Sequence, residues 1–91
     1  MKNVTARKLY EQKISWDQLF DSEQELIAKM LECETEKGLV PKGYGYIDSF
    51  KRFYKKNGYL TAKQLTQLKR LAKSVYAFVN DLKMSGLVIR I

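Results

Sequence analysis

Residues 68–91, LKRLAKSVYAFVNDLKMSGLVIRI, show the clearest helical pattern in the chain. Apolar residues recur through it, and just before it, at alternating steps of three and four: Leu65, Leu68, Ala72, Val75, Val79 and Leu82. This spacing is typical of one apolar helix face. Lys69 to Ala72 are all good helix formers, so nothing in the sequence indicates a turn there. We therefore predict one long C-terminal helix over about 61–85, packed at the centre of the domain.

Capping boxes predict where helices begin. In such a box a Ser or Thr and a Glu or Gln three residues later each accept the other's backbone N–H. The candidate pairs are Ser15 with Gln18, Ser22 with Glu25, and Thr61 with Gln64. The first and third pairs also have the flanking apolar residues of a hydrophobic staple, whereas the second does not. The sequence therefore leaves open whether residues 15–37 form one helix or two.

Glycines predict where helices end. Three of them follow lysine-bearing turns and precede an apolar residue, as in helices that close with a left-handed residue. The pairs are Gly38-Leu39, Gly58-Tyr59 and Gly86-Leu87. They predict helices that end near Lys37, Asn57 and Ser85. An earlier helical segment is expected at about 5–13.

The C-terminal tail, Leu87 to Ile91 (Leu87, Val88, Ile89, Arg90, Ile91), is the one strand-like segment. Its pattern is echoed by Gly38-Leu39-Val40, so the two segments are candidates for a minimal two-stranded ladder. Otherwise the apolar faces are helical, and residues 1–91 are predicted to form a single helical domain. The predicted fold class is all-α: a small bundle of roughly three to five helices with a long C-terminal helix and a short strand-like tail.

The composition excludes most catalytic sites. The chain has no histidine and one cysteine, Cys33. Ser/His and Cys/His sites and the usual zinc sites need imidazole or several thiolates. The glutamates at 32, 34 and 36 turn to different sides of a helix and make no paired acid. We therefore predict a non-enzyme with no cofactor and no metal.

Neither a membrane span nor a secretory signal is expected. Residues 1–8 lack the apolar core of a signal peptide. The longest apolar run, Val75 to Val79, is far shorter than the roughly 20 residues that cross a bilayer. The sequence therefore predicts a cytoplasmic protein with no membrane partner.

The charge is divided along the chain. The net charge is +7. Residues 1–20 carry four basic and two acidic groups, residues 21–40 two and six, and residues 41–91 eleven and two, which gives +2, −4 and +9. A strongly basic half favours a polyanion or an acidic protein surface as partner. Lysines that only keep the protein soluble are the alternative.

The stretch YGYIDSFKRFYKKNGY, residues 44–59, interleaves six aromatic and four basic side chains, as do surfaces that stack bases and hold phosphates. At helical spacing the apolar side chains share one face, which we interpret as core, and the basic ones the other. A hairpin across residues 57–60 would align this basic face with that of the next helix. This predicted surface, the basic ridge, comprises Lys51, Arg52, Lys55, Lys56, Lys63, Lys69, Arg70 and Lys73. Tyr44 and Tyr59, in loops, are the aromatic residues predicted to be free for stacking.

Two resemblances to known families bear on function. The spacing of Val75, Phe78, Val79 and Leu82 ahead of SGLVIR, residues 85–90, resembles the recognition helix and first wing strand of winged helix-turn-helix regulators. The chain departs from that family at the turn and at the wing, so we favour the long packing helix. Residues 50–68, FKRFYKKNGYLTAKQLTQL, resemble a pattern found in small proteins of bacteriophages and mobile elements. That resemblance implies a protein that acts on a host complex.

Three functions follow as hypotheses. The first is non-specific, salt-sensitive binding of nucleic acid through the basic ridge. The second is a phage or mobile-element protein that modulates or inhibits a host polymerase, nuclease or defence system, through the basic ridge or by adding its tail to a partner's sheet. The third is self-association, in which the acidic residues 21–36 of one copy meet the basic ridge of another. The sequence does not distinguish DNA, RNA and protein as the partner.

Overall fold

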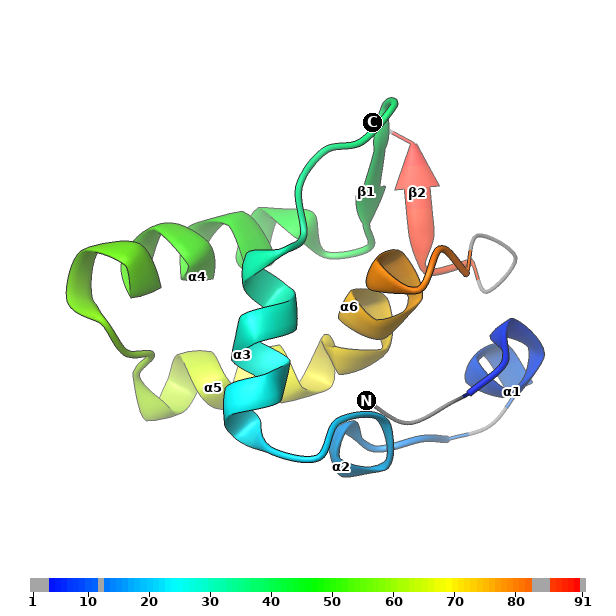
Figure 1. The fold of residues 1–91 in the computed structure, drawn as a ribbon, viewed down its shortest axis with the longest axis horizontal. Helices are drawn as coiled ribbons and strands as arrows, with labels where there is room; N and C mark the ends of the chain where they lie inside the picture. The colour runs from blue at the N-terminus through cyan, green and yellow to red at the C-terminus, as the bar shows by residue number, and fades with distance from the viewer. Residues whose placement is uncertain (1–3, 12, 83–85, 91) are drawn as a thin grey trace.

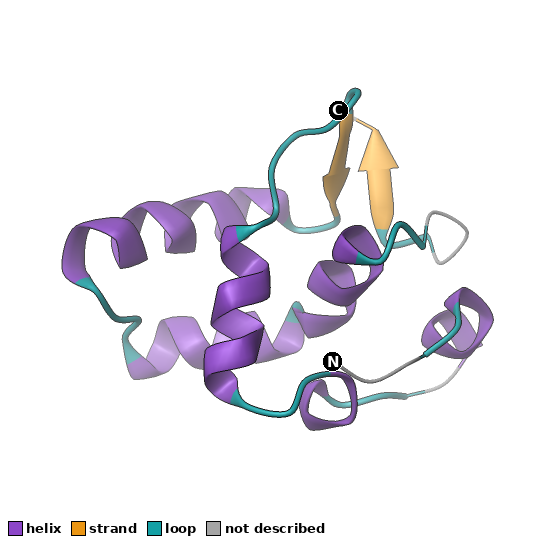
Figure 2. Cartoon of the chain, in the orientation of Figure 1, coloured by secondary structure: helices purple, strands orange, loops and turns teal. Residues whose placement is uncertain are grey.

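The computed structural model describes residues 4–11, 13–82 and 86–90. Within them the chain forms six helices and two short strands (Figure 1). In chain order these are α1 (Ala6–Glu11), α2 (Trp16–Leu19), α3 (Glu23–Leu31), β1 (Leu39–Pro41), α4 (Tyr44–Asn57), α5 (Ala62–Arg70), α6 (Ala72–Val79) and β2 (Val88–Arg90). Figure 2 shows the two strands side by side at one edge of a helical body. The fold is mostly helical, as predicted, but it is not strictly all-α, because it includes a two-stranded sheet.

Helix α6 is the centre of the core. It contacts α1, α2, α3 and both strands, and Val75, Tyr76 and Ala77 are buried on it. The ring of Tyr76 meets that of Phe20 edge to face, with centroids 6.0 Å apart. Its hydroxyl accepts a hydrogen bond from the backbone N–H of Val4 at 2.6 Å, which ties the start of the described chain to the core. The predicted central packing role is therefore confirmed for this part of the C-terminal stretch.

The predicted long helix over 61–85 is wrong. It is interrupted at Leu71, whose backbone (φ −94°, ψ 5°) separates α5 from α6, and the two helices meet at an angle in Figure 1. A methyl group on Gly43 would lie 2.8 Å from Cδ2 of Leu71, so Leu71 occupies the space left by that glycine. The break accompanies this tertiary contact, which helix propensity does not reveal.

Helix α6 also ends earlier than predicted, at Val79. The N–H of Leu82 bonds to the carbonyl of Ala77 at 2.8 Å, and that of Asp81 to the carbonyl of Phe78 at 3.2 Å. With Asp81 at φ 57°, these two bonds form the Schellman motif that was expected around Gly86. Aspartate tolerates the left-handed region better than most residues, so it closes the helix there. The predicted end, Ser85, lies outside the described residues.

Residues 15–37 contain two helices, and the second ends at Leu31 instead of near Lys37. Lys37 (φ 53°) and Gly38 (φ 77°) form a two-residue turn, in which Glu36 and Leu39 exchange backbone hydrogen bonds of 3.0 and 2.9 Å. Positive φ at both central residues is the type I′ geometry of tight hairpins. The glycine is left-handed as predicted, but it leads into β1 and does not close a helix.

Most of the local signals hold. Gln64 donates its backbone N–H to Oγ1 of Thr61 at 3.2 Å and accepts that of Thr61 at 2.9 Å, so this capping box is complete. Oγ of Ser22 accepts the N–H of Glu25 at 3.1 Å. Helix α4 ends at Asn57, before the left-handed Gly58. The predicted helix starts after Ser15 and Thr61 and the predicted helix end at Asn57 are therefore confirmed, and the box at Ser22, which the sequence had left open, begins a separate helix.

The pairing of the tail is confirmed. Strands β1 and β2 are antiparallel, with the register Leu39↔Arg90, Val40↔Ile89 and Pro41↔Val88. The backbone N–H of Lys42 also bonds to the carbonyl of Leu87 at 2.7 Å, and Leu87 and Val88 pack against the core. The described part of the tail is thus held by the domain. Ile91 lies outside the described residues.

Candidate functional site

The structure places Lys51 inside the protein, where only 5% of it is exposed. Its ammonium group donates a hydrogen bond to the carbonyl of Cys33 and lies 3.9 Å from Oε1 of Glu34. Backbone carbonyls just past a helix end need such partners, so Lys51 joins α4 to the segment after α3. The exposed basic surface therefore does not include it. Helical phase alone did not separate it from its exposed neighbours.

Lys69 is also engaged within the chain. Its Nζ lies 2.5 Å from Oε2 of Glu23 and 4.8 Å from the centroid of the Trp16 ring. The ion pair joins α5 to α3, and the cation–π contact joins α5 to α2. Lys69 therefore positions Trp16 and neutralises one carboxylate of the acidic segment.

The remaining ridge cations lie on helices that run in opposite directions (Figure 1). Arg52, Lys55 and Lys56 are exposed on α4, Lys63 and Arg70 are exposed on α5, and Lys73 is half-buried on α6. Arg52 forms an ion pair of 3.1 Å with Asp48. Tyr59 is 57% exposed, and its ring meets that of Phe53 edge to face, with centroids 5.7 Å apart. Tyr44 instead packs against the core.

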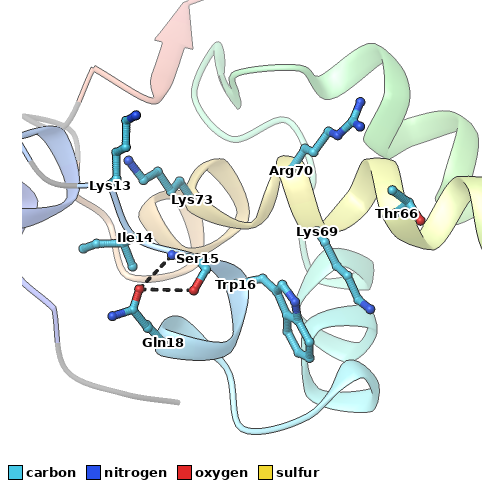
Figure 3. Close-up of a pocket in the computed structure, with 9 residues that line it drawn as sticks. All are labelled: Lys13, Ile14, Ser15, Trp16, Gln18, Thr66, Lys69, Arg70 and Lys73. Carbon is cyan, nitrogen blue, oxygen red and sulfur yellow. Dashed lines mark hydrogen bonds between the residues drawn. The ribbon is translucent and has the colours of Figure 1, made fainter.

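An open cleft of about 620 Å³ lies between the α5–α6 junction and the segment that leads into α2 (Figure 3). We call it the basic cleft, because four of its lining residues are cations and none is a carboxylate. The lining residues are Lys13, Ile14, Ser15, Trp16, Gln18, Thr66, Lys69, Arg70 and Lys73. A second hollow of about 330 Å³ shares Thr66 and Arg70 with it and adds Lys63. Together they form a basic surface along α5.

Local hydrogen bonds hold the wall opposite α5. Oε1 of Gln18 accepts the backbone N–H of Ser15 at 2.9 Å, while the Ser15 hydroxyl donates to Oδ1 of Asp17 at 2.5 Å and also lies 3.1 Å from Oε1 of Gln18. These bonds fix the start of α2 and therefore the position of Trp16, the first residue of that helix. In Figure 3 the side chain of Lys73 points toward that of Lys13, while Lys69 lies beside the indole.

The cleft unites predicted residues with two that sequence reasoning missed. Lys69, Arg70 and Lys73 line it, whereas the cations of α4 and Tyr59 do not. Lys13 and Trp16 were missed because they lie about fifty residues from α5 in the sequence, and no local pattern joins the two segments. The available signal was the Ser15 capping box, which sets the only tryptophan of the chain at the start of a helix.

The single cysteine, Cys33, is buried and held as the thiol. Burial raises the pKa of the Cys33 thiol from 9.0 to about 12, more than the nearby Lys51 ammonium lowers it, and the Glu32 carboxylate raises it further. The thiolate is the reactive form of cysteine, so this thiol is inert near neutral pH. Within residues 4–11, 13–82 and 86–90, no group of three or more His, Cys, Asp or Glu is placed to hold a metal ion. In the same residues no helix has the length and apolar character needed to span a membrane.

Comparisons of the chain with protein-family models, curated proteins and solved structures find no match. The assignment of a function therefore depends on the chemistry of the site.

Proposed function

We propose that this protein is a non-catalytic module that binds nucleic acid non-specifically, through the basic cleft and the hollow beside it. The supporting observation is a concave surface lined by four cations and no carboxylate. Phosphate backbones are bound chiefly by Lys and Arg, without regard to base sequence. The hollows are shallow and open, and they bring cations from the segment before α2 and from α5 and α6 to one surface.

The geometry sets an expected salt dependence. Lys69 is paired with Glu23, and the exposed cations that line the two hollows are Lys13, Lys63 and Arg70. If each of these three meets one phosphate, log K falls against log salt with a slope of about −2.7 for duplex DNA and about −2.1 for a single strand. Contacts from Arg52, Lys55 and Lys56 on α4 would steepen it.

Fluorescence anisotropy of a labelled 20-mer, measured between about 50 and 300 mM salt, tests the proposal. The test variant carries Lys13→Glu, Lys63→Glu and Arg70→Glu, three exposed positions. We expect it to lose measurable binding. Lys51 is left unchanged, because a carboxylate at that buried position would destabilise the fold.

A matched control variant carries Lys8→Glu, Lys42→Glu and Arg90→Glu, three exposed positions that line neither hollow. Both variants change the net charge from +7 by −6, to +1, so non-specific effects of charge are equal. We expect the control to keep most of the affinity. No binding by the wild-type protein at low salt, binding indifferent to salt, or equal losses in the two variants would refute the proposal.

A protein partner is the second candidate, and it is favoured by exposed aromatic side chains near the ends of α4. Tyr46 is 58% exposed and Tyr59 57%, and both lie on or next to a helix that exposes Arg52, Lys55 and Lys56. Tyrosine and arginine are enriched at protein interfaces. A partner that remains bound after nuclease treatment, and is lost with Tyr46→Ala and Tyr59→Ala, would support this function. The tail is a poor candidate for a free arm, because β2 pairs with β1.

A further inference from the structure

Trp16 is held at the wall of the basic cleft from two sides. The Lys69 ammonium lies 4.8 Å from the centroid of its ring, and Lys69 is in turn paired with Glu23 at 2.5 Å. The capping bonds between Ser15 and Gln18 fix the backbone at the start of its helix. A large aromatic side chain is thus pre-positioned in an open, cationic cleft, and pre-positioning lowers the entropic cost of binding.

The cations around Trp16 continue away from it along α5. The side chains of Lys13 and Lys73 lie near each other in the view of Figure 3 and come from two different segments, and Arg70 connects the cleft with the hollow that includes Lys63. A helix rises about 1.5 Å per residue, so the distance from Lys63 to Arg70 within α5 corresponds to roughly 10 Å. That length reaches more than one phosphate, since the phosphates of one strand are spaced about 3.4 Å along the axis in a B-form helix. The cleft therefore offers an aromatic side chain and a line of positive charge side by side.

We infer that the basic cleft binds single-stranded nucleic acid, with one unpaired base against the Trp16 indole and the adjoining phosphates at Lys13, Lys73, Arg70 and Lys63. This inference rests on the proposed function and specifies its ligand. In a duplex the base faces are covered by neighbouring bases, so only an unpaired base offers a face to the indole. Every base has such a face, so the preference for single strands comes without a preference for sequence.

The volume of the cleft agrees with this ligand. At about 620 Å³ the cleft lies within the range of roughly 300–1,000 Å³ typical of sites for small organic groups. A base and its sugar are groups of that kind. Among the residues that the structure describes, no carboxylate lines the cleft, and the two that adjoin it are engaged, Asp17 with the hydroxyl of Ser15 and Glu23 with Lys69.

The test uses the full chain and the intrinsic fluorescence of Trp16, the only tryptophan. The probes are a thymidine 15-mer, a 15-base-pair duplex of mixed sequence and thymidine monophosphate, titrated at one salt concentration. We expect the 15-mer to quench the fluorescence and to bind about 5- to 150-fold more tightly than the duplex, which is the range of one base stacked on an aromatic residue. The monophosphate should bind far more weakly, because it meets only part of the basic surface.

Two variants separate stacking from packing, since Trp16 also contacts the core. Binding by both is followed through a label on the DNA. Trp16→Phe keeps an aromatic ring and should retain most of the preference for single strands. Trp16→Leu should lose that preference and keep the salt-dependent affinity for duplex. If circular dichroism shows that Trp16→Leu is unfolded, the inference is tested by the wild-type protein alone. Its fluorescence quenching and its ratio of affinities for the single strand and the duplex are then the two readouts.

The outcomes distinguish the inference from the function on which it rests. Equal affinity for strand and duplex, without quenching, would overturn the single-strand inference and leave the proposed function standing. Monophosphate binding as tight as that of the 15-mer would overturn it too, because the cleft would then be a mononucleotide site. Absence of binding to every probe at low salt would overturn both.

Discussion

Replacing Gly43 with alanine tests the contact that accompanies the break between α5 and α6. Gly43 has φ 84°, and a methyl group there would lie 2.8 Å from Cδ2 of Leu71. The left-handed backbone costs a residue other than glycine about 1–2 kcal/mol, and overpacking typically costs about 1–3 kcal/mol. Because the end of the Leu71 side chain can rotate, we expect a total loss of about 2–4 kcal/mol. A chain of this length has about 5–14 kcal/mol of stability, so the variant should still fold.

Gly58 supplies a matched control. It has φ 78°, but a methyl group there would meet nothing within 4 Å, so Gly58→Ala should cost only the backbone term of about 1–2 kcal/mol. In a Leu71→Ala background the clash is absent, and Gly43→Ala should then cost about 1–2 kcal/mol as well. The double-mutant cycle therefore predicts a coupling of about 1–2 kcal/mol between positions 43 and 71.

Urea unfolding followed by far-UV circular dichroism gives the free energy of unfolding for the wild-type protein, the three single variants and the double variant. A loss of about 2–4 kcal/mol also lowers Tm by at least about 8 °C in a domain of this size. Equal costs for Gly43→Ala and Gly58→Ala would refute the reasoning. So would a cost of Gly43→Ala that does not change when Leu71 is truncated.

Three further predictions concern single residues. Lys51→Glu buries a carboxylate beside the Cys33 carbonyl and should cost about 3–5 kcal/mol, whereas Lys55→Glu on the exposed side of the same helix should stay within about 0.5 kcal/mol; similar urea midpoints for the two would contradict the observed burial. Burial raises the pKa of the Cys33 thiol from 9.0 to about 12. The contribution of the neutral thiol to the free energy of unfolding is therefore complete below pH 9 and is lost between about pH 9 and 12, at up to about 1.4 kcal/mol per pH unit. In Cys33→Ala that part of the alkaline decline should be absent, and an unchanged pH profile would count against it. Lys37→Asn should stabilise the type I′ turn by about 0.5–1 kcal/mol, measured as a rise in the urea midpoint, and a fall would show that the lysine has another role.

The structure explains why the candidate site could be predicted only in part. The basic side chains of α5 and α6 were visible in the sequence, because helical spacing predicts that Lys63, Arg70 and Lys73 share one side of the C-terminal segment. Lys51 and Lys69 are also lysines at helical spacing from the other ridge cations. In the structure, however, Lys51 is bound to a backbone carbonyl and Lys69 to Glu23. Sequence periodicity resolves faces of a helix but not which segment will cover them.

Chemistry that acts over a few residues could be predicted from the amino-acid sequence. The start of α5 at Thr61, the end of α4 before Gly58 and the left-handed Gly38 all depend on hydrogen bonds or dihedral preferences within one or two turns. The pairing of the tail was also predictable, because the chain has just two short segments of strand-like pattern.

Features that need distant segments to meet became visible only in the three-dimensional fold. The break at Leu71 occurs in a run of good helix formers and accompanies a contact with Gly43, which lies 28 residues earlier. The basic cleft likewise requires Lys13 and Trp16 to lie against α5. Contacts of this kind arise from close packing in three dimensions, and close packing is not encoded in the local spacing of residues.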